Sequence, residues 1–63
     1  MKTFQIIVTL RLVSGAYAFR KHQLQAGSET ALRVHLTYLL LFEEACTGGE
    51  VKRVETSELA LAS

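Results

Sequence analysis

Several common features of proteins are missing or scarce in this sequence. Its 63 residues include no proline, no tryptophan and a single cysteine, and seven basic residues against six acidic ones leave a net charge of +1. A single cysteine excludes an internal disulfide and points to a reducing, cytoplasmic location. The near-neutral charge argues against a strongly electrostatic DNA-binding role, and an apolar fraction of 49% argues against disorder. Because neither a linker nor a repeat is visible, we expect residues 1–63 to form one domain.

Motifs that carry chemistry are absent as well. The sequence has no glycine-rich phosphate loop, no metal-ligand spacing and no nucleophile elbow. Glu43 and Glu44 are adjacent, and adjacent helical side chains diverge by about 100° rather than share a site. We expect both to be solvated, with Glu43 at the end of an apolar stripe or paired with a base. His35 is interpreted as a buried histidine with a local hydrogen bond, and Cys46 as a small apolar filler. We therefore predict no enzyme, no metal and no cofactor.

Residues 1–18 allow two interpretations. Lys2, an apolar stretch and the triplet Ala16-Tyr17-Ala18 imitate a secretory signal peptide, whose removal would leave only about 45 residues. Against this, apolar residues from Phe4 onward alternate with polar ones, as in a half-buried strand. We favour the strand, and the mass of the purified chain tests the choice. A transmembrane span, and with it a membrane partner, is excluded by the charges of Arg11, Arg20 and Lys21.

Turn and capping signals divide the chain into four elements. Ser14-Gly15 predicts a tight turn, because glycine supplies the positive φ that such turns need. Ser28 is a favourable helix N-cap, and Gly48-Gly49 ends the helix. The second strand alternates poorly, so we expect it at a sheet edge or with a bulge. The predicted elements are strands at Lys2–Val13, Tyr17–Gln25 and Glu50–Thr56 and a helix at Glu29–Thr47, while residues 57–63 either continue the last strand or fray.

Two strands, a helix and a strand have few compatible arrangements. A right-handed crossover returns the third strand parallel to the second. Placing it beside the first strand gives a three-stranded antiparallel sheet in the order 2-1-3, with the helix covering one face. An α+β fold of ββαβ type is therefore the prediction. A chain of this length is near the lower limit for folding without a disulfide or metal, so we expect oligomerisation to add buried area.

The predicted helix is apolar over two stripes. Leu32, Leu36, Leu39 and Leu40 form the stripe that we assign to the sheet. A helix resting on a sheet needs an apolar arc of about 100°, and here the arc is roughly twice as wide. We interpret the second stripe as an interface, most simply of a symmetric homodimer, and scattered exposure as the alternative. The second stripe contains Ala31 and the five residues predicted to bind a partner, Val34, Tyr38, Leu41, Phe42 and Ala45.

Two short basic clusters offer an alternative function. Arg20 and Lys21 lie beside Tyr17 and Phe19 in the second strand, and basic plus aromatic side chains on a sheet can bind single-stranded nucleic acid. The other interpretation is a solvated edge whose charges prevent strand addition. The residues of this alternative interface are Arg20, Lys21, Lys52 and Arg53.

The second half of the chain resembles a group of very small phage-encoded proteins. The resemblance rests on QLQAGSETAL, which leads into the helix, and on the helix end and last strand, GGEVKRVET. Some type I-F anti-CRISPR proteins share this β-β-helix-β plan and a similar final strand. The resemblance implies an inhibitor that docks on a large host nucleoprotein complex through surface charges, and it assigns no individual interface residue.

Overall fold

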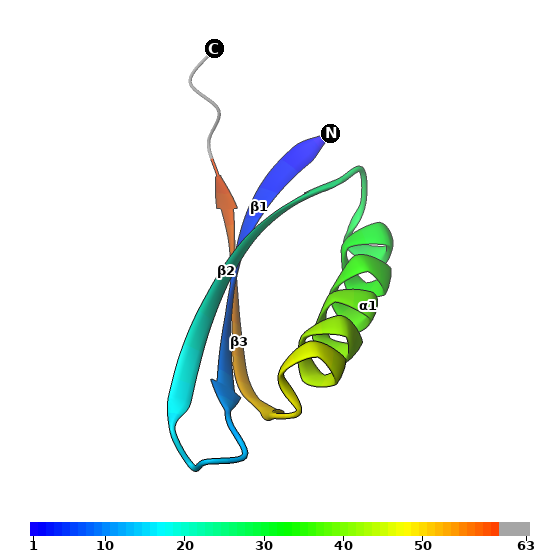
Figure 1. Cartoon of the computed structure of the whole chain (residues 1–63). Helices are drawn as coiled ribbons and strands as arrows, with labels where there is room; N and C mark the ends of the chain where they lie inside the picture. Colours follow the sequence, from blue (N-terminus) through cyan, green and yellow to red (C-terminus); the bar gives the residue numbers. More distant parts are fainter. Residues whose placement is uncertain (60–63) are drawn as a thin grey trace.

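The computed structural model describes residues 1–59 and contains four elements (Figure 1). The three strands form one antiparallel sheet in the order β2-β1-β3, and the helix lies against one face of it. This arrangement confirms the predicted α+β fold of ββαβ type. The elements are β1 (Lys2–Arg11), β2 (Tyr17–Ala26), α1 (Glu29–Thr47) and β3 (Glu50–Leu59).

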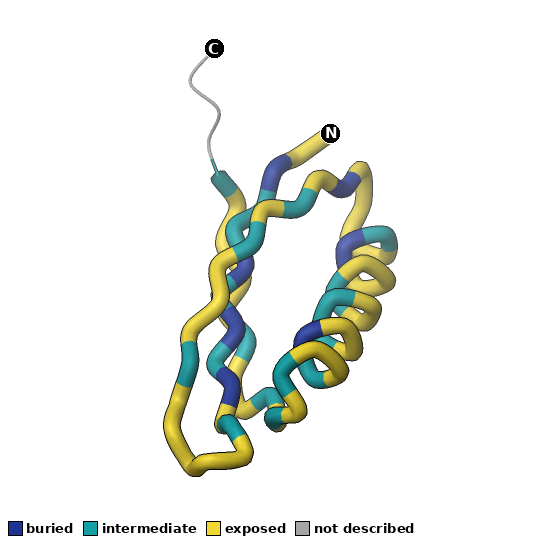
Figure 2. Tube along the Cα trace, in the orientation of Figure 1, coloured by how far each residue is buried: buried dark blue, intermediate teal, exposed yellow. Residues whose placement is uncertain are grey.

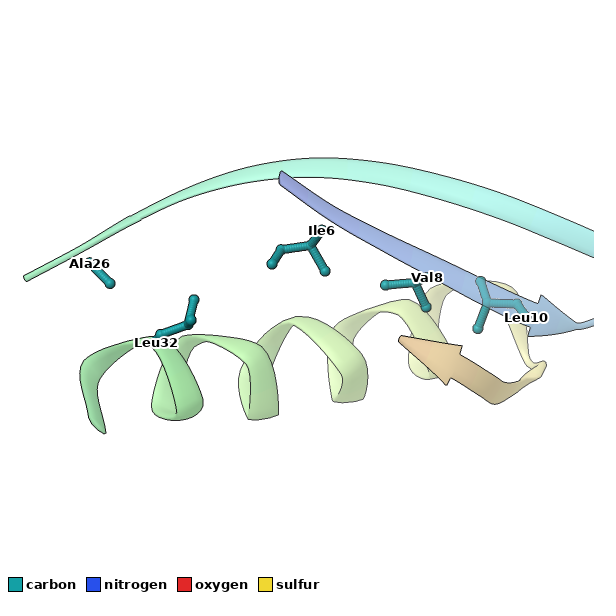
Figure 3. Close-up of a cluster of buried hydrophobic side chains, with 5 residues drawn as sticks. All are labelled: Ile6, Val8, Leu10, Ala26 and Leu32. Carbon is teal, nitrogen blue, oxygen red and sulfur yellow. The ribbon is translucent and has the colours of Figure 1, made fainter. Parts of the chain in front are cut away.

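The central strand β1 supplies most of the hydrophobic core. Because side chains alternate along a strand, every second apolar residue of β1 faces α1. Ile6, Val8 and Leu10 are 0% exposed, and all three project from β1 toward the helix (Figure 3). Ala26 at the end of β2 and Leu32 on α1 complete the buried cluster. The predicted leucine stripe is confirmed, since the other three leucines pack against this cluster while partly exposed: Leu36, Leu39 and Leu40.

Both ends of α1 are capped as the sequence predicts. The Oγ atom of Ser28 accepts a hydrogen bond from a backbone N–H of the first turn at 3.1 Å. Gly48 ends the helix in the left-handed region at φ 68°, where a side chain would be strained. At Gly49 a Cβ atom would lie 2.7 Å from the carbonyl oxygen of Arg11, so only glycine fits beside the end of β1. The two glycines therefore have different physical roles.

One element boundary differs from the prediction, and another decides between two alternatives that the sequence left open. β1 ends at Arg11 rather than Val13, because the backbone of Leu12 bonds within the turn instead of the sheet. Its N–H donates to the carbonyl of Ala16, and its carbonyl accepts from Gly15, both at 2.8 Å. At the other end of the chain, β3 continues through residues 57–59. The possible fraying of the last four residues, 60–63, lies outside the described residues.

The irregularity expected in the second strand occurs in the third. β2 is an edge strand, as predicted, but its pairing with β1 has no register shift. The β1–β3 ladder instead shifts by one residue and leaves Lys52 as an extra residue, which is a β-bulge. Val51 and Val54 both pack against the core. The two residues between them, Lys52 and Arg53, are consequently both exposed on the other face of the sheet.

Candidate functional site

The outer face of α1 is apolar and uncovered by any described part of the chain. We use the name helix outer face for Val34, Tyr38, Leu41, Phe42 and Ala45. All five side chains are exposed, and on a wheel of about 100° per residue they lie opposite the leucines that pack on the sheet. Figure 2 shows this side of the helix largely exposed and the side toward the sheet partly buried. The exposed fractions of the four large residues are 49% for Val34, 70% for Tyr38, 59% for Leu41 and 61% for Phe42.

Ala31 does not belong to this face. The sequence pattern placed it in the second stripe, but it is half-buried and packs against the core cluster. It lies near the helix start, close to the point where the chain arrives from β2. The apolar area without a partner in the described chain therefore begins one turn later, at Val34.

A charge cluster around the buried Glu43 joins the end of α1 to β2. Glu43 is 5% exposed, and its carboxylate lies 3.0 Å from Nε2 of His22 and 3.5 Å from Nε of Arg20. The predicted pairing of Glu43 with a base is thus confirmed, but the prediction that its carboxylate is solvated is wrong, because the helix holds it against β2. Within residues 1–59, neither Oε2 of Glu43 nor Nε2 of His22 has an aligned hydrogen-bond partner, so the contacts of the buried carboxylate are its ion pair with Arg20 and the close approach of the His22 ring. The cluster anchors an edge strand to the helix.

Two predictions for the helix are wrong. His35 and Cys46 are both exposed, so neither is a buried residue filling the core. Both lie on the flank of the helix outer face, beside the exposed Phe42 on the wheel. An apolar sequence neighbourhood suggested burial, but nothing in the described chain covers that side of the helix.

The face of the sheet that points away from α1 carries aromatic and basic side chains. Residues paired directly across antiparallel strands share a face, so the pairing register identifies its members. Tyr17 and Phe19 lie on it at 60% and 70% exposure. We use the name sheet open face for the exposed aromatic and basic residues Arg11, Tyr17, Phe19, Lys21, Lys52 and Arg53.

The alternative nucleic-acid residues are divided between the two faces of the sheet. Lys21 lies on the open face, and the bulge brings Lys52 and Arg53 to the same face. Arg20 lies on the opposite face, where it contacts Glu43. Sequence reasoning grouped Arg20 with Lys21 because they are adjacent, although strand alternation separates neighbours. It missed Arg11, which the alternation of β1 against its buried neighbours would have identified.

Acidic residues neutralise part of the open face. Nζ of Lys52 lies 3.3 Å from a carboxylate oxygen of Glu50, and Nε of Arg53 lies 2.9 Å from one of Glu55. Among the described residues, Arg11 and Lys21 have no such carboxylate partner, and these two exposed cations remain available for an anionic ligand.

No protein-family model, curated protein or solved structure is significantly similar to this chain. The described helix is not long and apolar enough to cross a membrane. In residues 1–59 no three histidine, cysteine or acidic side chains come together in a group that could hold a metal ion. Function must therefore be argued from the two exposed surfaces.

Proposed function

We propose that this is a small non-enzymatic protein that acts by protein–protein contact, with the helix outer face forming a homodimer. The observation that carries the proposal is the exposure of four large apolar side chains on the side of α1 that points away from the sheet. Together they present an apolar area on the order of 400 Å², within the range of the largest, often functional patches of monomeric proteins. No charged residue belongs to this face, so covering it buries no unpaired charge.

The spacing of these residues suits a second helix as the partner. Val34, Tyr38, Leu41 and Ala45 follow one another at intervals of four, three and four residues, the pattern of a helix–helix seam. In an antiparallel pair, Tyr38 of one copy lies beside Leu41 of the other, and Val34 beside Ala45. Each pair combines a larger and a smaller side chain, as interlocking helices require. A second copy of the chain supplies such a helix without any other component.

The size of the face sets the expected strength of the dimer. Two apolar areas of about 400 Å² bury about 800 Å² together, below the 1,200–2,000 Å² typical of stable complexes. Flanking polar residues add to this, and we expect a dimer that dissociates in the micromolar range. Its assembly should therefore depend on protein concentration.

The experiment is light scattering coupled to size exclusion over a concentration series. The original chain should pass from monomer to dimer, while Tyr38→Glu and Phe42→Glu should remain monomeric because each places a charge in the seam. Gln23→Glu is the matched control: it adds the same charge to an exposed position of β2, on the face of the sheet that points away from α1. A chain that stays monomeric at every concentration, or a dimer that both seam variants leave unchanged, contradicts the proposal.

The resemblance to small phage-encoded proteins extends this proposal and stays a prediction. A type I-F anti-CRISPR-like inhibitor would contact a host nucleoprotein complex, so a host protein is the second partner to test. The exposed surfaces described above are the regions that such a partner could contact.

A further inference from the structure

We propose that the sheet open face binds single-stranded nucleic acid, with bases stacked on Tyr17 and Phe19 and phosphates held by the surrounding cations. This surface is separate from the helix outer face, and the proposal does not depend on the dimer. It revises the sequence-based alternative, because Arg20 leaves the interface and Arg11 enters it.

The two aromatic side chains are placed as a stacking platform. Tyr17 and Phe19 are two residues apart on β2, so they point to the same side with about 6.6–6.8 Å between them. Both are more than half exposed on a face that no described element covers. Aromatic rings on a sheet surface take unpaired bases because every base has a flat π-face. Each ring can therefore carry one base.

Basic side chains surround this platform. Across the sheet, Tyr17 is opposite Arg11, and Phe19 is opposite Thr9, which is in turn opposite Arg53. Lys21 follows Phe19 on the same face of β2. The strands are about 4.8 Å apart, so Arg53 lies about 10 Å from Phe19 across the sheet. A backbone running beside the aromatic pair can thus meet Arg11 and Arg53 on the side toward β1, and Lys21 beyond Phe19.

The bulge in β3 concentrates charge on this face. In a regular strand Lys52 and Arg53 would point to opposite sides, but the extra residue leaves both on the open face. The open face then has four cations against Glu50 and Glu55, a net charge of +2. The other three cations and four acids give the rest of the chain a net charge of −1. The near-neutral total conceals this asymmetry.

The mixture of groups favours nucleic acid over an apolar protein surface. Thr9 places a hydroxyl between Phe19 and Arg53, and side-chain amides follow beyond Lys21; such groups hydrogen-bond to base edges and sugars. A duplex keeps its bases stacked on one another and cannot use the aromatic rings, so the preferred ligand is single-stranded. The uncharged polar residues on this face are Thr3, Gln5, Thr9, Gln23, Gln25 and Ser57.

The test is fluorescence anisotropy with a labelled oligothymidylate of about 12 nucleotides, within the site sizes of single-strand-binding domains. Binding should weaken about 20-fold when salt rises fourfold, as expected for three phosphate contacts. Phe19→Ala should weaken binding about tenfold through lost stacking, whereas Phe19→Tyr should retain it. Lys21→Gln should make the dependence of log K on log salt shallower by about 0.7. Arg33→Gln, which removes an exposed charge from α1, is the matched control and should bind like the original chain.

Three results would overturn the proposal. The first is no binding at low salt by a chain whose circular dichroism shows it to be folded. The second is equal affinity for the single strand and for a duplex of the same sequence, since that would leave the aromatic residues without a role. The third is competition by poly-glutamate as strong as by unlabelled oligothymidylate, which would show a site for acidic protein segments instead. Phe19→Ala is examined alongside Phe19→Tyr so that a folding defect is distinguished from lost stacking.

Discussion

Tyr38 and Phe19 have the same exposed fraction, 70%, and lie on opposite sides of the molecule. Their surroundings differ. Tyr38 belongs to a helix face without charges, whereas Phe19 has the basic Lys21 and the hydroxyl of Thr9 beside it on the sheet. The exposure of these two residues identifies the helix outer face and the sheet open face as surfaces that can bind a partner. The side chains around each residue indicate which kind of partner it binds. The uncharged helix outer face is complementary to another apolar helix. The aromatic rings and cations of the sheet open face are complementary to a polyanion with flat bases.

The largest expected effect separates the two sides of α1. Leu32→Ala should lower the free energy of unfolding by about 2–3 kcal/mol, because it removes buried contacts from a small core. Leu41→Ala makes the same chemical change on the helix outer face. It should lower the free energy of unfolding of the monomer by no more than about 0.5 kcal/mol. Urea denaturation at low protein concentration measures both. Equal costs would mean that the helix outer face is already covered within the chain.

The second effect concerns the contact that holds the sheet open face in place. Glu43→Gln should lower the free energy of unfolding by about 1–2 kcal/mol. The loss of a fully buried ion pair would cost more, but Arg20 is half exposed and can be hydrated in the variant. Glu44→Gln is the matched control, since its side chain can still accept the hydrogen bond from the backbone N–H of Val51. Hydrogen exchange should become faster in β2, which carries Phe19, and stay unchanged in β3. Uniform acceleration through the sheet would contradict this local role.

The smallest effect tests the bulge. Deleting Lys52 leaves Val51, Arg53 and Val54 in regular alternation, with both valines still facing the core, so stability should change by less than about 1 kcal/mol. Oligothymidylate binding should become less salt-dependent by the same amount as in Lys52→Gln, since each variant removes one cation. Thermal melts and salt titrations check the two expectations. A deletion that unfolds the chain would show that the bulge shapes β3 rather than only orienting its charges.

The fold was predictable because local signals agree with one another. The alternation of β1, the N-cap at Ser28 and the two glycines after α1 each mark an element, and few arrangements connect four such elements. The leucine stripe and the second apolar stripe, which has no partner in the described chain, were also visible in the sequence as a helical pattern. These features depend only on residues close together in the sequence.

The rest depends on contacts between distant residues. The bulge at Lys52 exists because β3 must pair with β1 while Val51 and Val54 both reach the core. Arg20 faces the helix because it pairs across the sheet with Val8, and there it meets Glu43. His35 was predicted to be buried from its apolar neighbours, but it lies on the side of α1 that nothing in the described chain covers. Register and packing, not composition, decide these positions.

Because the helix lies on one side of the sheet, a dimer formed through the helix presents two open faces for nucleic acid. A dimer joined through the helix outer faces stacks as sheet, helix, helix, sheet, with the two open faces pointing apart. A short oligonucleotide can then reach only one of them, while a long or looped strand can reach both and gain avidity from the second site. Such a dimer would bridge separate strands, so an affinity that is modest for a short oligonucleotide would increase with strand length.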